Sequence, residues 1–266
     1  MKNTLNLAFK NAREENRPAL VSYTVAGDPN KKKSLAILKE ISKNVDIVEW
    51  GFAHNCPTAD GKEIQNSSYR ALKNGLKLKD VFQMVKQYKK SKSSKPLILM
   101  GYYQMIFNYG EKKFVKKCKE NGVSGLIVVD LNWPYNKKFA TLCKKNSICF
   151  VQLLAPTTTN IRMKKIIKDS HDMIYYISML STTGGKLKVS PRKIIENYKK
   201  IKKLSGNKNL VIGFGITNKT ISSLKTADGL VVGSQLCKTI TDSIKKRQNP
   251  VTKLDKLVYS LKNKIL

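Results

Sequence analysis

Short apolar runs alternate with amphipathic stretches along the whole chain. Most runs are continuous in Val, Ile and Leu, which is typical of strands that are buried on both faces. The intervening stretches have a helical pattern: in Lys112 to Asn121, Phe114, Val115 and Cys118 share one face, lysines occupy the other, and Gly122 supplies a stop. The predicted strands are Leu20 to Ala26, Asp46 to Gly51, Leu97 to Tyr102, Gly125 to Leu131, Ile148 to Leu154, Met173 to Met179, Leu210 to Ile216 and Gly229 to Ser234.

Eight strand–helix units predict a closed parallel α/β barrel, the TIM (β/α)8 barrel, with right-handed crossovers and helices outside. The 266 residues fit one such barrel, and no Gly-, Pro- or Ser-rich linker divides them, so we expect a single domain over residues 1–266. The alternative is an open doubly wound sheet. An open sheet would need edge strands that carry charge or proline, and these are not evident in the sequence.

The net charge of +33 raises the question of nucleic-acid binding, because phosphate neutralisation is a common use of a large positive field. Only six of the 51 basic residues are arginine, the better base reader, and the lysines are spread over nearly every predicted helix without an interleaved aromatic stripe. We therefore expect no nucleic-acid partner. Abundant Lys, Asn and Ile are typical of an AT-rich coding bias, as in the genomes of symbionts.

The sequence gives no sign of a membrane segment or of a metal centre. It lacks both the long apolar core of a signal peptide and any run of roughly 20 apolar residues, so we expect a cytoplasmic protein without a membrane partner. The five cysteines are odd in number and show no CxxC spacing, and His54 and His171 are the only histidines. We therefore expect neither a disulfide framework nor a metal site.

Two carboxylates are the main candidates for chemistry. Glu49 stands at the end of an apolar run, and Asp60 lies in the polar loop that follows. In a barrel of this kind the carboxyl ends of the strands and the loops behind them form the active site, and two carboxylates facing one pocket can move protons. The alternatives are a solvated or ion-paired strand end for Glu49 and a simple Asp-Gly turn for Asp60.

Other polar side chains at the same strand ends have plainer interpretations. Tyr102 and Tyr175 could fill the barrel with satisfied hydroxyl groups. Asp130 is expected to brace a loop by accepting amide hydrogen bonds, and it is left out of catalysis. His54, in the loop after the second strand, could pass for a general base, but an exposed loop histidine usually has no such role.

Glycines cluster in the last three strand-to-helix loops, at Gly184-Gly185, Gly213 to Gly215 and Gly233-Ser234. Glycine lets backbone amides approach an anion closely, and the amino end of the helix after the last strand adds its dipole. Barrel phosphate sites form in these loops. The pattern therefore predicts a phosphate cradle opposite the two carboxylates.

Short motifs occupy the strand ends and their loops. They are Tyr23 to Pro29, Val48 to Gly51, Ala59 to Gly61, Ile64 to Asn66, Tyr102-Tyr103, Ile106 to Gly110, Gly125 to Leu131, Ala155 to Thr158, Tyr175 to Ser178, Thr183-Gly184, Gly213 to Ile216 and Gly233-Ser234. In this order and spacing the chain resembles the alpha subunit of tryptophan synthase over almost its whole length. The resemblance implies a TIM barrel that cleaves indole-3-glycerol phosphate into indole and glyceraldehyde 3-phosphate in L-tryptophan biosynthesis. It also implies a beta-subunit partner that carries pyridoxal phosphate in an alpha2beta2 assembly, with no cofactor in this chain.

The cleavage explains the residue types. Indole C3 must gain a proton and the neighbouring hydroxyl must lose one, so Glu49 is predicted to have a raised pKa and to act as acid and then as base. Asp60, if ionised, accepts the indole N1–H and stabilises positive charge on the ring. The predicted substrate contacts are Tyr23, Tyr102, Ile127, Leu154, Tyr175, Thr183 and Phe214, and the predicted phosphate-binding residues are Gly184, Gly215, Gly233 and Ser234.

The chain departs from the family pattern in its loops. Ala53 to Pro57 replaces the family's Pro-Phe-Ser-Asp-Pro, residues 179–184 lack an Arg and the first Gly, and Gln104 and Asn132 replace Asn and Pro. Since these loops serve closure and contact with the beta subunit, we hypothesise retained lyase chemistry with weakened intersubunit signalling. One alternative is a catalytically weakened subunit that mainly binds and activates the beta subunit. Another is a different phosphate-binding barrel isomerase or lyase, which would need its own strand-end Lys or Asp arrangement.

Overall fold

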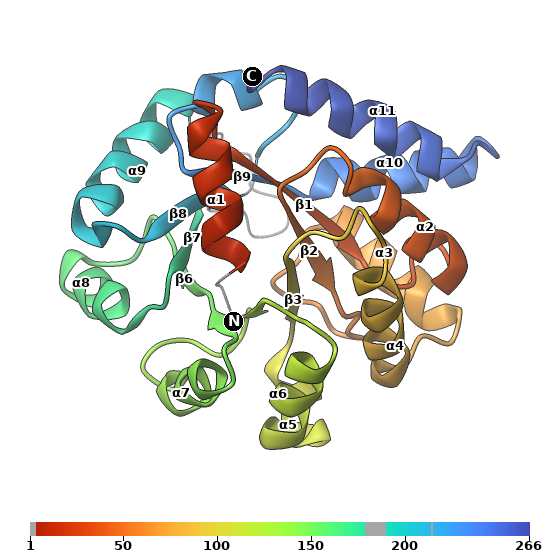
Figure 1. Ribbon diagram of the computed structural model, residues 1–266, viewed down its shortest axis with the longest axis horizontal. Coiled ribbons are helices and arrows are strands. Elements are labelled where there is room, and N and C mark those ends of the chain that lie inside the picture. The colour runs from red at the N-terminus through yellow and green to blue at the C-terminus, as the bar shows by residue number, and fades with distance from the viewer. Residues whose placement is uncertain (1–3, 179–189, 214) are drawn as a thin grey trace.

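Parallel strands form a barrel that is surrounded by helices (Figure 1), in a computed structural model that describes residues 4–178, 190–213 and 215–266. The hydrogen-bonded order of the strand segments is β5-β4-β3-β2-β1-β9-β8-β7-β6. β5 and β6 are two halves of one strand interrupted at Val151; β5 pairs with β4 and β6 with β7, so this strand closes the barrel. The strands are β1 (Ala19–Val25), β2 (Ile47–Gly51), β3 (Leu97–Gly101), β4 (Gly125–Val128), β5 (Cys149–Phe150), β6 (Gln152–Leu154), β7 (Met173–Ile177), β8 (Asn209–Gly213) and β9 (Gly229–Val232).

The helices lie outside the barrel, and α1 lies across one end of it (Figure 1). Phe9 of α1 is buried against Gly229, the first residue of β9, and Leu5 lies against Gly125, the first residue of β4. Within the described residues no helix is long and apolar enough to cross a membrane. The helices are α1 (Thr4–Glu14), α2 (Lys31–Ile41), α3 (Lys62–Lys73), α4 (Leu78–Lys89), α5 (Tyr103–Tyr109), α6 (Glu111–Glu120), α7 (Lys137–Lys145), α8 (Asn160–Asp169), α9 (Pro191–Ser205), the 3-10 turn η1 (Ile221–Leu224), α10 (Ser234–Lys245) and α11 (Pro250–Asn263).

The predicted barrel and its strands are confirmed, and most of the predicted strands extend too far at their carboxyl ends. Tyr102 begins the turn into α5 as its N-cap, and residues 129–131 leave β4 in a turn. Met179, the predicted end of the sixth strand, lies outside the described residues. The predicted helix at 112–121 is α6, and Gly122 ends it with φ of 79°.

The strand register fixes which side chains face the barrel interior. Tyr23 is paired with Glu49, and Glu49 with Ile98, while Met100 is paired with Ile127. Partners in a parallel register point to the same side of a sheet, and successive residues alternate between sides. A continuous inner face therefore leads from β1 through β2 and β3 to β4, and Glu49 lies on it near the carboxyl ends of the strands.

Candidate active site

Glu49 is a buried carboxyl group inside the barrel. It is 1% exposed, and its Oε2 atom has no hydrogen-bond partner among the described residues. Burial raises the pKa of Glu49 to about 8, and the negative charge of Asp60 adds to this shift. Glu49 is therefore largely protonated at neutral pH and can donate a proton to a molecule bound beside it.

Asp60 approaches the interior from the loop between β2 and α3. The Tyr102 hydroxyl donates a hydrogen bond to Oδ2 of Asp60 over 3.1 Å and accepts one from the backbone N–H of Ala59 over 3.0 Å. The side-chain amide of Gln65 donates to the backbone carbonyl of Asp60 over 2.8 Å. Bonds from both sides of the loop thus fix the position of this carboxylate.

The two carboxyl groups differ in charge at neutral pH. Burial raises the pKa of Asp60 to about 6, while the hydrogen bond from Tyr102 opposes that shift by favouring the anion. Asp60 is therefore mostly ionised at pH 7, where Glu49 is mostly protonated. One cavity thus holds a proton donor and an anionic acceptor, which is the division of roles that general acid–base chemistry requires.

A cavity with an empty volume of about 560 Å³, including its open mouth, joins these groups to the glycine loops. A ligand there would lie beside both carboxyl groups and beside the loops after β8 and β9. The lining residues are Tyr23, Glu49, Asp60, Ile64, Met100, Tyr175, Gly215, Ile216, Thr217, Val231, Gly233, Ser234 and Gln235.

Two tyrosines depend on glycines in neighbouring strands for their place in this cavity. A Cβ atom at Gly51 would collide with the hydroxyl of Tyr23, and one at Gly213 would collide with the hydroxyl of Tyr175. Burial raises the pKa of both tyrosines well above the ordinary value. Their hydroxyl groups therefore stay neutral and can donate hydrogen bonds inside the barrel.

The end of the cavity that the glycine loops form has the features of an anion site. Gly215 has φ of 70°, a conformation that favours glycine, and Gly233 is the N-cap of α10, which begins at Ser234. The first N–H groups of a helix have no intrahelical acceptor and carry its positive dipole end. Backbone N–H groups at this end are thus suited to bind a phosphate.

The structure places some predicted contacts beside the cavity. Tyr102 does not line the cavity, but its hydroxyl donates a hydrogen bond to the Asp60 carboxylate. Ile127 is the register neighbour of Met100, which lines the cavity. Three residues after Ile127, in the turn that follows β4, Asp130 accepts a hydrogen bond of 2.7 Å from the N–H of Tyr103 at the start of α5, as expected for a loop brace.

The register does not bring Leu154 to the cavity. Leu154 is paired with Tyr176, whose hydroxyl accepts a hydrogen bond from Asn197 of α9, so this face of β6 and β7 points to the helix layer. The preceding residue, Leu153, is paired with Tyr175 and shares the inner face with it. Neither Leu153 nor Leu154 is among the described residues that line the cavity, so the predicted indole contact at Leu154 is not supported by the register.

Three predicted contacts, Thr183, Gly184 and Phe214, lie outside the described residues. His54 is half-buried and stacks on Tyr102 with ring centroids 4.8 Å apart, so it is not simply exposed. Among the residues that the structure describes, no group of three or more His, Cys, Asp or Glu side chains could hold a metal ion.

Sequence reasoning missed several cavity residues. Ile64 belongs to a motif that it quoted, and Met100 stands two residues before Tyr102 at a strand end, which is a readable signal. Gln235 follows the predicted phosphate residue Ser234 directly. Ile216 stands in the motif Gly213 to Ile216, whereas Thr217 and Val231 are brought to the cavity only by the loop path and the strand register.

Comparisons with known proteins agree on one family. The family model described as tryptophan synthase alpha chain matches residues 9–266. The tryptophan synthase alpha chain of Pelagibacter ubique (strain HTCC1062) is 67% identical over 261 residues, 98% of each chain, and that of Thermococcus kodakarensis is 38% identical over 246 residues, 91% of this chain and 95% of the relative. A crystal structure of tryptophan synthase subunit alpha from Legionella pneumophila has a TM-score of 0.91 at 27% identity and covers 100% of this chain and 99% of its own. The tryptophan synthase complex from Pyrococcus furiosus contains a chain with a TM-score of 0.80 at 34% identity, covering 91% of this chain and 97% of that one.

Proposed function

Because the chain belongs to the tryptophan synthase alpha chain family, we propose that Glu49 and Asp60 perform the family's reaction in the cavity between them. The protein is a lyase of tryptophan biosynthesis that cleaves indole-3-glycerol phosphate into indole and glyceraldehyde 3-phosphate. The roles of individual residues follow from their burial, charge and contacts.

Glu49 supplies both proton transfers. In its neutral form it protonates C3 of the indole ring, which turns the ring into a leaving group. The carboxylate that remains accepts the proton of the hydroxyl on the adjacent carbon while the carbon–carbon bond breaks and the aldehyde forms. Glu49 ends the cycle protonated, so the reaction needs no other proton donor and no redox partner.

Asp60 stabilises the ring. Its carboxylate accepts a hydrogen bond from the indole N1–H and offsets the positive charge that develops on the ring when C3 is protonated. Tyr102 supports this role because its hydroxyl favours the ionised form of Asp60. The neutral Tyr175 and Tyr23 form the walls around the reacting end.

The phosphate end anchors the substrate. Gly215, Gly233 and Ser234 line the cavity from the loop after β8 and from the start of α10, and their backbone N–H groups are the proposed phosphate donors. Binding energy from this remote group orients the indole end against the two carboxyl groups. Thr183, Gly184 and Phe214 stay predictions for this end and for the indole slot.

The single observation that carries the assignment is the unpaired Oε2 of Glu49 inside a cavity that Asp60 also lines. A strand-end glutamate with a structural role would have an ion-pair partner or water around it. A subunit retained only as a binding partner for the beta subunit would have no need for a buried, unpaired carboxyl group. The enzyme is therefore favoured over that alternative.

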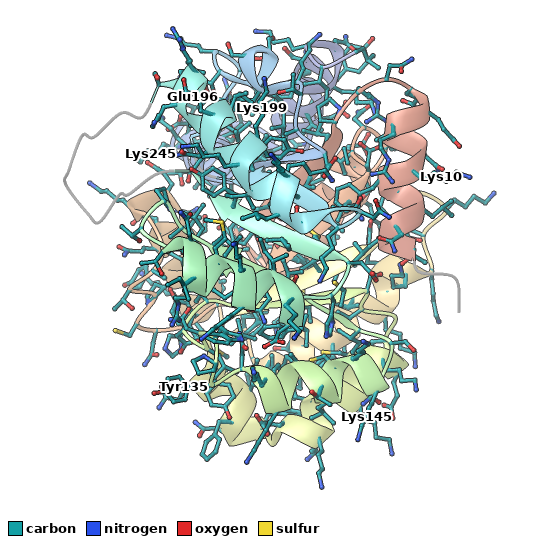
Figure 2. The ribbon with its side chains drawn as sticks, turned by 90° about the vertical axis from the view of Figure 1, so that its left-hand side faces the viewer. Lys10, Tyr135, Lys145, Glu196, Lys199 and Lys245 are labelled. Carbon is teal, nitrogen blue, oxygen red and sulfur yellow. The ribbon has the colours of Figure 1, made fainter. Side chains whose placement is uncertain are left out.

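We also propose a tryptophan synthase beta subunit as partner. Three large apolar side chains are exposed at the carboxyl end of the barrel: Phe107 of α5, Tyr135 before α7 and Ile161 of α8, with 65%, 84% and 73% of their surface accessible. Figure 2 shows Tyr135 at the edge of the molecule opposite Lys10 and Lys145. These exposed apolar side chains are the proposed contacts with that partner.

The finer points of this assembly follow from the family. We expect an alpha2beta2 complex in which the beta subunit carries pyridoxal phosphate and receives the indole, while this chain uses no cofactor. A cytoplasmic location and the coding-bias interpretation of the lysine content stay predictions as well.

The test of the activity is incubation of the purified protein with indole-3-glycerol phosphate, with release of indole as the measured quantity. Continuous, enzyme-dependent release is the expected result. No release at any pH between 6 and 8, from protein whose circular dichroism shows the folded barrel, would contradict the proposal.

A further inference from the structure

We propose that Gln235 is a positioning residue that fastens the loop at residues 215–220 to the start of α10, so that the phosphate cradle is formed before the substrate binds. The inference rests on the proposed function and concerns its phosphate end. Gln235 belongs to the first turn of α10 and lines the cavity beside Ser234.

The central contact joins Gln235 to Asn218. The Oε1 atom of Gln235 accepts a hydrogen bond of 3.1 Å from the backbone N–H of Asn218. A backbone N–H can only donate, so this contact fixes the orientation of the amide group and places its oxygen toward the loop.

Asn218 is held from a second direction by α11. Its backbone carbonyl accepts a hydrogen bond of 2.7 Å from Nζ of Lys264, and its Oδ1 lies 3.5 Å from Oγ of Ser260. The N–H of this one loop residue is thus bound to the first turn of α10 and its C=O to the C-cap of α11, and these two helices lie side by side in Figure 1. Lys264 also places a positive charge on a carbonyl that would otherwise oppose an anion.

Thr220 fixes the shape of the loop itself. Its hydroxyl donates to the carbonyl of Gly215 over 2.7 Å and accepts from the N–H of Thr217 over 3.0 Å. Gly215 lines the cavity, and its carbonyl is engaged by this bond. Thr220 therefore sets the conformation of the loop, whereas Gln235 and Lys264 set its position relative to α10.

A preformed loop increases the affinity for phosphate. If the backbone N–H groups that bind the phosphate were mobile, binding would have to order them. Ordering them on binding costs free energy that lowers affinity. A fixed loop removes that cost for every ligand that carries the phosphate. The gain is the same for the bound substrate and for the transition state of the reaction. Loss of the Gln235 contact should consequently raise KM and leave kcat nearly unchanged.

The experiment uses Gln235→Met, which keeps the length of the side chain and removes the acceptor. We expect KM for indole-3-glycerol phosphate and the inhibition constant of glycerol 3-phosphate to rise together, by roughly 3- to 10-fold, as for loss of one neutral hydrogen bond. Affinity for free indole, which lacks the phosphate, should stay at the parental value. Gln248→Met is the matched control, because Gln248 is exposed beyond the end of α10, away from the cavity.

Lys264→Met tests the same loop from α11, with Lys253→Met, exposed on the same helix, as its control. A selective loss of glycerol 3-phosphate affinity in both test variants supports the proposal. Unchanged glycerol 3-phosphate affinity in Gln235→Met, or an equal loss for indole, would overturn it. Failure of the proposed function is distinguishable, because the parental protein would then release no indole.

Discussion

The hydroxyl of Tyr102 donates a hydrogen bond of 3.1 Å to Oδ2 of Asp60, although the two residues lie on different loops of the barrel. The same hydroxyl accepts the N–H of Ala59, so one tyrosine orients the carboxylate and the backbone beside it. The bond also favours the charged form of Asp60 against its burial. A side chain that does not itself line the cavity thus contributes to both the position and the charge of Asp60.

Tyr102→Phe should weaken the enzyme most at acidic pH. Without the donor, the pKa of Asp60 rises further, so less of the active anion is present below pH 7. We expect kcat/KM near pH 6 to fall by about 3- to 10-fold, and by less near pH 7.5. Tyr103→Phe is the control, because the Tyr103 hydroxyl contacts Glu111 and not Asp60. A uniform loss over the whole pH range in Tyr102→Phe would argue against this role.

The parental enzyme should show a bell-shaped pH dependence of kcat/KM. Activity needs Asp60 ionised and Glu49 protonated, so it should rise as pH increases through about 6 and fall as pH increases through about 8. Asp60→Asn, which has no titrating group at this position, should lose the acidic limb. Initial rates measured from pH 5 to pH 9.5 are the test, and a profile that is flat from pH 5 to pH 7 would be inconsistent with this assignment.

Glu49 should also make the fold less stable as pH increases. Its pKa in the folded chain, about 8, lies above its value of 4.5 in the unfolded chain, so the folded state binds more protons between these two values. The stabilising contribution of the neutral group is complete below about 4.5 and is lost as pH rises toward 8. Urea unfolding at pH 5.5 and pH 8.5 should therefore show a smaller loss of stability in Glu49→Gln than in the parent, and an equal loss would contradict this.

Arg70→Met should strongly destabilise the fold. The guanidinium group of Arg70 binds both oxygens of Asp28 over 2.8 Å, and the side chain of Asp28 is 0% exposed. Removing one partner of a buried pair leaves an uncompensated charge and typically costs about 3–5 kcal/mol of unfolding free energy. Arg192→Met, which breaks the exposed pair with Glu196, should leave the unfolding free energy nearly unchanged. Similar midpoints in urea for both variants would refute the distinction.

We predict that the beta subunit activates this chain only weakly, because the loop at 53–57 carries Ala53 and Cys56 where the family resemblance implies a proline and an aspartate. In this loop Cys56 is exposed and His54 stacks on Tyr102. We expect beta subunit to increase the rate of indole release only modestly, and the variant Ala53→Pro/Cys56→Asp to respond more strongly. Rates measured with and without the partner decide this, and full activation of the parental chain would contradict weakened coupling.

The barrel was predictable from the sequence because strands buried on both faces must be apolar at nearly every position. Their carboxyl ends were not predictable to the residue, since Tyr102 is apolar enough to continue a strand yet caps α5 instead. The two carboxyl groups were predictable because their positions in the sequence are unusual for charged residues. Glu49 is a charged residue type in an apolar run, and Asp60 follows in the next loop.

The contacts around the carboxyl groups were harder to predict. Leu153 and Leu154 are equally apolar, and a shift of one residue moves a side chain to the other face of the sheet. Only the pairing of β6 with β7 distinguishes them. The role of Gln235 depends on Asn218, which is brought beside it by loop geometry rather than by any spacing in the sequence.

The most direct test of the central claim is the rate of indole release from indole-3-glycerol phosphate by Glu49→Gln. Glutamine keeps the shape of the side chain but cannot transfer a proton, so kcat should fall by roughly 100-fold or more. Glu63→Gln is the matched control, because Oε2 of Glu63 is likewise buried without a hydrogen-bond partner among the described residues, yet Glu63 does not line the cavity. The account predicts near-parental release from this control. Parental kcat in a folded Glu49→Gln protein would contradict the account.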